Sequence, residues 1–211
     1  MPLDAPGAEA RITIVVLAGG DATRLPGKLA LPVDGEPMLA RVLRVLSATG
    51  APCLVAAGAR PPEALDANLR IPVVYDEHPG DGPLAALASA AGAVDTPYFF
   101  AVAGDMPGID AAFVARIVAA ADAAGWPDAI VPRHADGAIE PLAAMYKRDP
   151  WVASARTALA QGRRNVSAAL DGLRVVYYDI VPEDESALAN VNTPSDYERL
   201  RSASSARDGR P

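Results

Sequence analysis

The segment Ile12–Val33, ITIVVLAGGDATRLPGKLALPV, decides how the rest of this chain is organised. Its first seven residues, Ile12–Ala18, are apolar and rich in β-branched side chains. Such a run is too short for a helix of its own and is typical of a buried strand. Gly19 and Gly20 follow, at a point where a Cβ would block a tight turn or the close approach of a ligand. The segment therefore predicts a strand that ends in a glycine turn.

Two cations, Arg24 and Lys28, flank the Pro26-Gly27 pair that follows this turn. Backbone N–H groups in such a turn, with a guanidinium and an ammonium nearby, suit the binding of a polyphosphate. The alternative is an ordinary glycine turn beside two solvated cations, and the glycines alone favour that alternative. Because both cations occur at this spacing, we predict a phosphate-binding loop.

The composition narrows the class of protein. The 211 residues are most simply one domain, and a hydrophobic content of 51%, much of it alanine, favours packed helices over an all-β design. The net charge of −7 argues against a general nucleic-acid binder. No apolar stretch approaches the roughly 20 residues of a membrane span, and the N-terminus does not follow the pattern of a secretion signal. The single Cys53 is expected to fill the core. One cysteine excludes a disulfide framework and is compatible with a reducing compartment, so we expect a cytoplasmic protein.

Short apolar strands alternate with helical segments along most of the chain. Strands are predicted at Ile12–Ala18, Cys53–Ala57, Val73–Tyr75, Tyr98–Ala103, Ala129–Pro132, Leu142–Tyr146 and, possibly at an edge, Leu173–Ile180. Helices are predicted at Met38–Thr49, Pro61–Asn68, Leu84–Gly92, Ala111–Ala124 and Pro150–Gln161, with a short one from Ser167 and a final one from Pro194. This alternation predicts one α/β domain over residues 11–201, with an open sheet. Residues 1–10 and 202–211 are expected to be disordered tails.

An open α/β sheet binds ligands beyond the carboxyl ends of its strands. Gly19-Gly20, Asp76 and Asp105 each directly follow a predicted strand, so we expect them at one edge of the sheet. Asp105, preceded by Gly104 that leaves room for something bulky, could hold Mg²⁺ shared with substrate phosphates. The alternative role of Asp105 is to form a turn or to cap a helix, and the alternative for Asp76 is a solvated acid in a loop. Three such turns together favour a ligand site.

Several segments of the chain resemble motifs of one enzyme family. Leu17-Ala18-Gly19-Gly20, with Arg24 and Lys28, is similar to the signature of nucleotidyltransferases that join a nucleoside monophosphate to a phosphorylated acceptor. The segments that resemble the molybdenum-cofactor guanylyltransferases in particular are Gly82-Pro83-Leu84-Ala85, Gly104-Asp105-Met106-Pro107, Glu140-Pro141-Leu142-Ala143-Ala144-Met145-Tyr146 and Asn190-Val191-Asn192-Thr193-Pro194. Each segment is a weak signal alone, but the occurrence of all of them in this order over residues 12–200 is specific for the family.

The resemblance implies a Rossmann-like α/β fold of the nucleotide-diphospho-sugar transferase type, with a mostly parallel sheet and helices on both faces. It implies transfer of GMP from GTP to the phosphate of the molybdopterin cofactor, with release of pyrophosphate. The implied nucleotide and cofactor contacts are Leu17, Ala18, Gly19, Gly20, Lys28 (triphosphate), Asp76, Gly82, Pro83, Asn190 and Asn192 (pterin pocket), and the implied Mg²⁺ ligand is Asp105. Molybdoenzyme apo-proteins or their chaperones would receive the product.

Such a transfer needs little covalent help from the protein. An acceptor phosphate oxygen attacks the α-phosphorus in line with the departing pyrophosphate, so positioning and charge stabilisation dominate. We hypothesise that Lys28 and Arg24 neutralise the β- and γ-phosphates, while Asp105 holds Mg²⁺ between the α-phosphate and the acceptor. No general base is required because the acceptor phosphate is already ionised, which agrees with the presence of only two histidines, His78 and His134.

Two features of the sequence leave alternatives open. The loop between Arg24 and Lys28 is shorter than is usual in the family, and the turn Ala57-Gly58-Ala59-Arg60 lacks the Asn that often helps to select guanine. The nearest alternatives are a cytidylyltransferase for the same cofactor and a sugar-phosphate nucleotidyltransferase. An alternative of another class is a non-catalytic module that binds a nucleotide or the cofactor. The presence of both Lys28 and Asp105 argues against this module, which would need neither.

Overall fold

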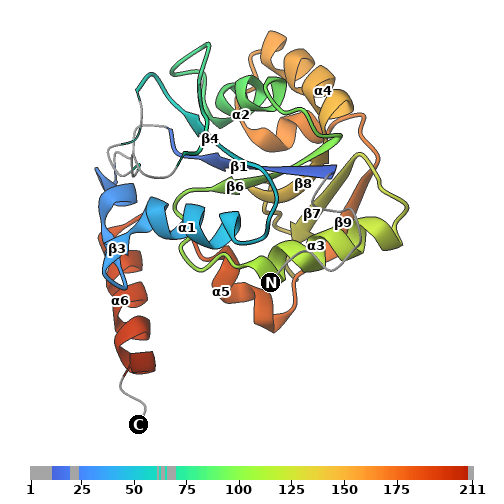
Figure 1. The fold of residues 1–211 in the computed structure, drawn as a ribbon. Coiled ribbons are helices and arrows are strands. Elements are labelled where there is room, and N and C mark those ends of the chain that lie inside the picture. The colour runs from blue at the N-terminus through green and yellow to red at the C-terminus, as the bar shows by residue number, and fades with distance from the viewer. Residues whose placement is uncertain (1–10, 20–23, 61, 63–64, 66–69, 209–211) are drawn as a thin grey trace.

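The fold is one α/β domain built on a seven-stranded mixed sheet, seen nearly edge-on in Figure 1. The computed structural model describes residues 11–19, 24–60, 62, 65 and 70–208. The strands are β1 Ile12–Leu17, β4 Cys53–Ala57, β5 Val73–Tyr75, β6 Tyr98–Ala103, β7 Ala129–Arg133, β8 Ala143–Lys147 and β9 Val175–Asp179. Their spatial order is β5-β4-β1-β6-β8-β7-β9. Only β8 runs antiparallel to its neighbours, so the sheet is mostly parallel, as predicted.

Helices cover both faces of this sheet (Figure 1). The helices are α1 Met38–Ser47, α2 Pro83–Gly92, α3 Ala111–Ala123, α4 Arg148–Ala160, α5 Glu185–Leu188 and α6 Pro194–Asp208. Three 3₁₀ turns, η2 Lys28–Ala30, η3 Val166–Leu170 and η4 Pro182–Asp184, and a small ribbon of β2 Pro32–Val33 and β3 Glu36–Pro37 complete the described elements. The α1 and α3 helices lie on one face, and α2 and α4 lie on the other.

The alternation of side chains along β1 explains why one short strand serves two hydrophobic cores. Ile12, Ile14 and Val16 pack into the core shared with α1 and α3, whereas Val15 and Leu17 pack into the core shared with α2 and α4. Successive side chains of a strand point to opposite faces, and a parallel sheet covered on both sides favours apolar residues at nearly every position. Thr13 is the exception in β1, and its buried hydroxyl lies 2.8 Å from that of Thr96. The nearly continuous apolar run of the sequence is therefore the signature of a central strand.

An aromatic cluster joins the sheet to α4. Phe99 on β6, Tyr146 on β8 and Trp151 on α4 have ring centroids 5.2 to 5.4 Å apart, and Trp151 is fully buried. The hydroxyl of Tyr146 donates to the carbonyl of Pro141 at 2.7 Å, and burial raises the pKa of Tyr146 far above its usual value. Aromatic residues bury a large apolar area, so this cluster holds the second half of the chain to the sheet.

The predicted elements match the structure closely, with one difference at the C-terminal end. Strand and helix boundaries agree within about two residues, and β9 lies at the sheet edge, as expected. We expected a tail from residue 202, but α6 continues to Asp208. The stretch from Arg201 to Asp208 holds alanine, serine and arginine and no glycine or proline, so nothing in it stops a helix before Gly209. The predicted tail at 1–10 and most of the predicted helix Pro61–Asn68 lie outside the described residues.

Cys53 packs against the core, as expected from the sequence. It lies at the start of β4, is partly buried, and packs against the core that β1 shares with α1. Burial raises the pKa of the Cys53 thiol, which lowers the fraction of nucleophilic thiolate near neutral pH. Separately, no helix among the described residues is long and apolar enough to cross a membrane.

Candidate active site

The strands that carry the predicted site residues end at the same level of the sheet. Leu17 at the end of β1 pairs with Ala56 on β4 and with Ala103 on β6. On the outer side, Tyr75 of β5 pairs with Ala57 of β4. The turns that follow β1, β4, β5 and β6 therefore form one row along the carboxyl edge of the sheet, which is where this class of sheet binds its ligands.

Two glycines of this row are required by contacts within the protein. A Cβ on Gly19 would lie 2.5 Å from the backbone nitrogen of Gly58, in the turn after β4. A Cβ on Gly104 would lie 2.9 Å from the carbonyl oxygen of Leu17 and 3.2 Å from the side chain of Leu39. We expected Gly104 to leave room for a bulky group, but the neighbouring strand and α1 fill that space. Gly19 likewise lets two turns pack together, and Gly20 lies outside the described residues.

Lys28, Asp105 and Asn192 come together at the centre of the row. The Lys28 ammonium forms an ion pair with the Asp105 carboxylate and donates a hydrogen bond to Asn192 Oδ1 at 2.8 Å. The side chains of Lys28 and Asp105 are only 16% and 14% exposed, so water screens their pairing incompletely. The structure thus brings together the predicted triphosphate cation, the predicted metal ligand and one predicted acceptor residue. Among the described residues the Asp105 carboxylate accepts no hydrogen bond from the following turn, so the alternative role of a turn or helix cap is not seen.

Arg24 stands apart from this cluster. It lies in the turn before η2, is exposed, and makes no ion pair or hydrogen bond with any residue that the structure describes. Leu17 and Ala18 are almost fully buried, and the Leu17 carbonyl accepts a hydrogen bond from Gly104 N at 2.8 Å. A ligand would therefore meet the β1 turn through the backbone at Gly19 rather than through the Leu17 side chain.

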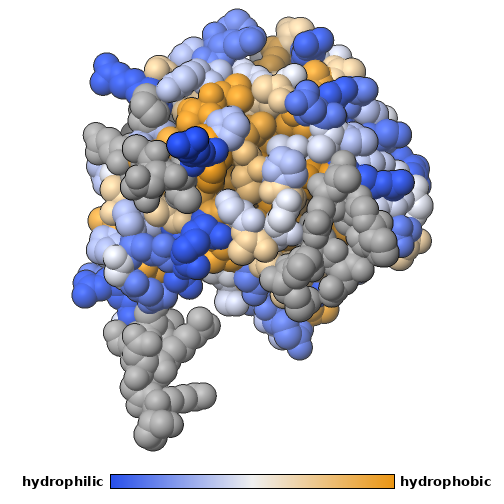
Figure 2. Space-filling view, in the orientation of Figure 1, coloured by the Kyte–Doolittle hydropathy of each residue, from blue (hydrophilic) through white to orange (hydrophobic). Residues whose placement is uncertain are grey.

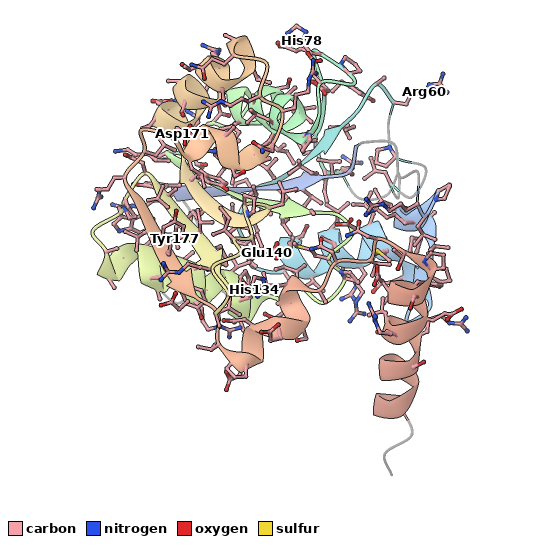
Figure 3. The ribbon with its side chains drawn as sticks, turned by 180° about the vertical axis from the view of Figure 1, so that it is seen from behind. Arg60, His78, His134, Glu140, Asp171 and Tyr177 are labelled. Carbon is pink, nitrogen blue, oxygen red and sulfur yellow. The ribbon has the colours of Figure 1, made fainter. Side chains whose placement is uncertain are left out.

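Asp76 lies at the end of β5 and is tied to its own turn and to α2. Its Oδ1 accepts hydrogen bonds from the backbone N–H of His78 at 2.9 Å and from the hydroxyl of Ser89 at 3.4 Å. These contacts hold the carboxylate in place and leave Oδ2 without a partner among the described residues. The structure does not bring Asp76 into contact with Lys28 or Asp105. His78 and Arg60 lie at the outer rim of the molecule in Figure 3.

Gly82 and Pro83 begin α2 and lie against the basic loop after α4. Gly82 has a φ of +83°, and a Cβ there would lie 3.1 Å from the carbonyl oxygen of Arg164. The same carbonyl accepts a hydrogen bond from Leu84 N at 3.2 Å, and the Arg164 guanidinium pairs with Asp81. Proline is favourable at the first position of a helix because its missing N–H would have no helical partner there. The Gly-Pro pair therefore docks the start of α2 on the Arg164 loop.

The Glu140-Pro141-Leu142 segment connects β7 to β8 beside the end of β6. The Leu142 carbonyl accepts a hydrogen bond from Ala103 N at 3.0 Å, which places this segment next to the Asp105 turn. Glu140 Oε1 lies 3.0 Å from Nε2 of His134, and Figure 3 shows the two side chains together. The segment thus forms part of the same carboxyl edge. A cavity of about 540 Å³ lies beyond it, lined by Arg133, His134, Ala135, Asp136, Gly137, Asp179 and Ile180.

The segment Asn190–Thr193 approaches the cluster from the C-terminal part of the chain. Val191 N donates to the Asp105 carbonyl at 2.9 Å, and the Val191 side chain is buried against Val33 and Met38. Asn190 Nδ2 donates only to the nearby carbonyl of Leu188, at 3.4 Å, among the residues that the structure describes. The two asparagines therefore differ, since Asn192 reaches Lys28 and Asn190 does not.

A buried carboxylate that we did not predict ties the turn before α5 to α3 and β9. Asp184 is fully buried and accepts hydrogen bonds from Arg116 Nε at 2.8 Å, from the Tyr178 hydroxyl at 2.9 Å and from Val181 N at 3.2 Å. Burial and the bond to Asp184 raise the pKa of Tyr178. In the sequence Asp184 stands between two other acidic residues and looks like a solvated loop residue, so only the fold distinguishes it.

We expect Gly108→Ala to damage the site from a distance. A Cβ on Gly108 would lie 1.9 Å from the carbonyl oxygen of Ser186 on α5, so the Asp105 turn and α5 must move apart. Because α5 leads into Asn190–Thr193, the variant should unfold at a lower temperature and lose activity together. Thermal unfolding followed by circular dichroism measures the first effect. The control Gly92→Ala lies at the end of α2 with open space around it and should be at least as stable as the native protein.

The donor set at Asp105 fits a divalent cation that is shared with a substrate. Mg²⁺ is usually held by one or two carboxylates together with substrate phosphates rather than by a full protein cage. Among the described residues no group of three or more His, Cys, Asp or Glu side chains gathers around a common point, and Asp105 is the carboxylate of the central cluster. The arrangement can therefore bind a polyanion with a cation at Lys28 and a metal at Asp105.

Figure 2 shows how hydrophilic and hydrophobic residues are distributed on one face of the molecule. Hydrophilic residues lie mainly around the rim of this face and at its lower left, where α6 leaves the domain. More hydrophobic residues lie towards the centre.

The net charge of the chain is −7, so a phosphate-rich ligand must be attracted by local cations rather than by the whole protein. Lys28 supplies such a cation, and Arg24 supplies a second in the same loop.

Comparison with known proteins places these features in one family. The model of the MobA-like NTP transferase domain matches residues 14–174. A probable molybdenum cofactor guanylyltransferase of Opitutus terrae is 36% identical over 88% of this chain and 93% of its own length. Another from Natronomonas pharaonis is 32% identical over 90% of this chain and 96% of its own length.

A solved structure shows the same fold. Molybdopterin-guanine dinucleotide biosynthesis protein A from Archaeoglobus fulgidus superposes with a TM-score of 0.75 and 25% sequence identity, over 92% of this chain and 99% of that one. The family model covers most of the chain, and the curated relatives cover nearly all of it. This chain belongs to the MobA-like NTP transferase family.

Proposed function

We propose that this protein transfers GMP from GTP to the phosphate of the molybdopterin cofactor and releases pyrophosphate. The observation that carries the proposal is the meeting of Lys28 and Asp105 at the carboxyl edge of the sheet, in a member of a nucleotidyltransferase family. The relatives that are 32% and 36% identical over most of the chain carry the name guanylyltransferase, which supports this substrate pair.

The chemistry forms one P–O bond and breaks another. An oxygen of the acceptor phosphate attacks the α-phosphorus of GTP, and the bond to the β-phosphate breaks, so that pyrophosphate leaves with the electron pair. The obstacles are the repulsion between two anions and the charge that develops on the leaving group. In this proposal Lys28, together with Arg24 from the same loop, neutralises the β- and γ-phosphates. Asp105 would hold Mg²⁺, which when bound supplies charge neutralisation for the α-phosphate and the acceptor phosphate.

The remaining site residues divide between nucleotide and acceptor. In this proposal the backbone of Leu17 to Gly20 and the free oxygen of Asp76 contact the nucleotide. Gly82 and Pro83 are further contacts of the bound substrates. Asn190 and Asn192 line the acceptor side, on the segment that packs on the Asp105 turn. The proposed recipients of the product are molybdoenzyme apo-proteins or their chaperones. The proposed compartment is the cytoplasm, where the unpaired Cys53 stays reduced.

A pyrophosphate-release assay tests this function directly. Purified protein with Mg²⁺ and molybdopterin cofactor is offered GTP, CTP or ATP separately, and we expect release with GTP alone. Release with CTP would keep the mechanism and overturn the base assignment. This outcome matters because the turn Ala57-Gly58-Ala59-Arg60 lacks the Asn that often helps to select guanine in the family. No release with any nucleotide would refute this reaction and favour another acceptor, such as a sugar phosphate, or a non-catalytic binding module.

A further inference from the structure

Asn192 directs its side-chain oxygen at the nucleotide half of the site. Its Oδ1 accepts a hydrogen bond from Lys28 Nζ at 2.8 Å, across 164 positions of sequence. Because a lysine ammonium only donates hydrogen bonds, the oxygen and not the amide nitrogen must face it. The Asn192 amide nitrogen has no partner among the described residues and remains available to another group.

The Lys28 ammonium has two hydrogen-bond acceptors among the described residues, and in the proposed reaction one of them, Asp105, binds a metal. The first acceptor is the Asp105 carboxylate and the second is Asn192 Oδ1. A divalent cation on Asp105 competes directly with the Lys28 ammonium for that carboxylate, because the two positive charges seek the same oxygens. Once a metal is bound, Asn192 is the acceptor that still restrains the Lys28 side chain among the described residues.

The backbone holds Asn192 in place independently of its side chain. The backbone N–H groups of Asn192 and Thr193 donate to Asp196 Oδ2 at 3.0 and 2.8 Å, and Asp196 N donates to the Thr193 hydroxyl at 3.2 Å. This is a reciprocal cap at the start of α6, and it lowers the pKa of Asp196 through hydrogen bonds from Thr193 and Asn192. Removing the Asn192 side chain therefore leaves the cap, and with it the local fold, intact.

We propose that Asn192 is a positioning residue that holds the Lys28 ammonium at the triphosphate when Asp105 is engaged by a divalent cation. This inference rests on the proposed function, because it takes Lys28 as the triphosphate contact and Asp105 as the metal ligand. It gives Asn192 a task on the nucleotide side, beyond the acceptor contact that the family resemblance implies. A flexible lysine loses rotamer freedom when it binds, and a preformed hydrogen bond reduces that cost.

Calorimetric titration of GTP into the protein without any acceptor tests the proposal. With Mg²⁺ or Mn²⁺ present, we expect Asn192→Ala to bind GTP about three- to tenfold more weakly than the native protein, which lies within the range for the net contribution of one typical intramolecular hydrogen bond. With EDTA in place of the metal, Asp105 still restrains Lys28, and the two proteins should differ by less than twofold. A merely structural defect would weaken binding equally in both conditions.

Two further variants make the test specific. Gln161→Ala removes an exposed side-chain amide at the end of α4, which has no role in the proposed site and does not contact Lys28, and should leave the GTP affinity in the presence of metal within twofold of native. In the double variant Lys28→Ala/Asn192→Ala, GTP should bind no more weakly than in Lys28→Ala alone, because Asn192 acts through Lys28. Unchanged affinity in Asn192→Ala, or full additivity in the double variant, overturns the proposal. Absence of GTP binding by the native protein would instead refute the proposed function.

Discussion

Asp105→Asn should lower Mg²⁺-dependent turnover by about 1,000-fold or more, on the order of 4 kcal/mol of transition-state stabilisation. The substitution keeps the size and shape of the side chain but removes the charge that a divalent cation requires. Asp105 is the carboxylate at the centre of the site, and among the described residues no group of three or more His, Cys, Asp or Glu side chains offers another metal site. Steady-state pyrophosphate release over a range of Mg²⁺ concentrations measures the effect.

Structural and metal-binding measurements separate this loss from misfolding. The asparagine can still accept a hydrogen bond from Lys28, and the backbone contact to Val191 is untouched, so the unfolding temperature should change little. Binding of Mn²⁺ in the presence of GTP, followed by electron paramagnetic resonance, should be lost. Asp149→Asn is the matched control, because that carboxylate is 80% exposed at the start of α4 and should not affect turnover. Near-native activity of Asp105→Asn would place the metal elsewhere.

Lys28→Ala should cost about 2–4 kcal/mol of transition-state stabilisation, a fall in kcat/KM of about 30-fold to 900-fold. The ammonium is expected to stabilise the charge that develops on the departing pyrophosphate, so the loss should appear in kcat as well as in KM. The chain contains two lysines, Lys28 and Lys147, which offers a natural control. Lys147 lies exposed at the end of β8, and Lys147→Ala should keep native activity.

The same variant should change metal binding in the opposite direction. In the nucleotide-free protein the Lys28 ammonium occupies the Asp105 carboxylate and competes with any cation there. Lys28→Ala removes this competitor, so Mn²⁺ alone should bind more tightly than to the native protein while turnover falls. Tighter metal binding together with slower turnover is an outcome that general destabilisation cannot produce. Native-like turnover in Lys28→Ala would remove this residue from the leaving-group role.

Much of the fold was predictable because local sequence patterns carry it. Apolar runs of three to six residues mark the buried strands, and helical periodicity marks α1 and α3. The direction of β8 does not follow from its composition, which resembles that of a parallel strand. Its antiparallel course follows from the short connection Arg133–Ala143, since a parallel crossover needs a dozen or more residues. The length of the connection between β7 and β8 therefore predicts the antiparallel direction of β8, whereas the side-chain pattern of β8 does not.

The location of the site could be predicted from the sequence, but many of the contacts within it could not. Turns that follow parallel strands must meet at one edge, so Gly19, Asp76 and Asp105 could be assigned to that edge in advance. The reason for Gly104 could not, because the space beside it is filled by Leu17 and Leu39 from other elements. The burial of Asp184 could not be predicted either, because it depends on Arg116 of α3 and on Tyr178 near the end of β9.

The sequence by itself determined the strands, the helices, the edge at which ligands bind and the cations and carboxylates present there, because these follow from periodicity and chain direction. Only the tertiary structure decided that Lys28 contacts Asp105, 77 positions away, and Asn192, 164 positions away. Such contacts depend on the order of the strands and on how α5 and the start of α6 pack on the Asp105 turn. The free energy of that packing is spread over distant segments, so no local pattern records it.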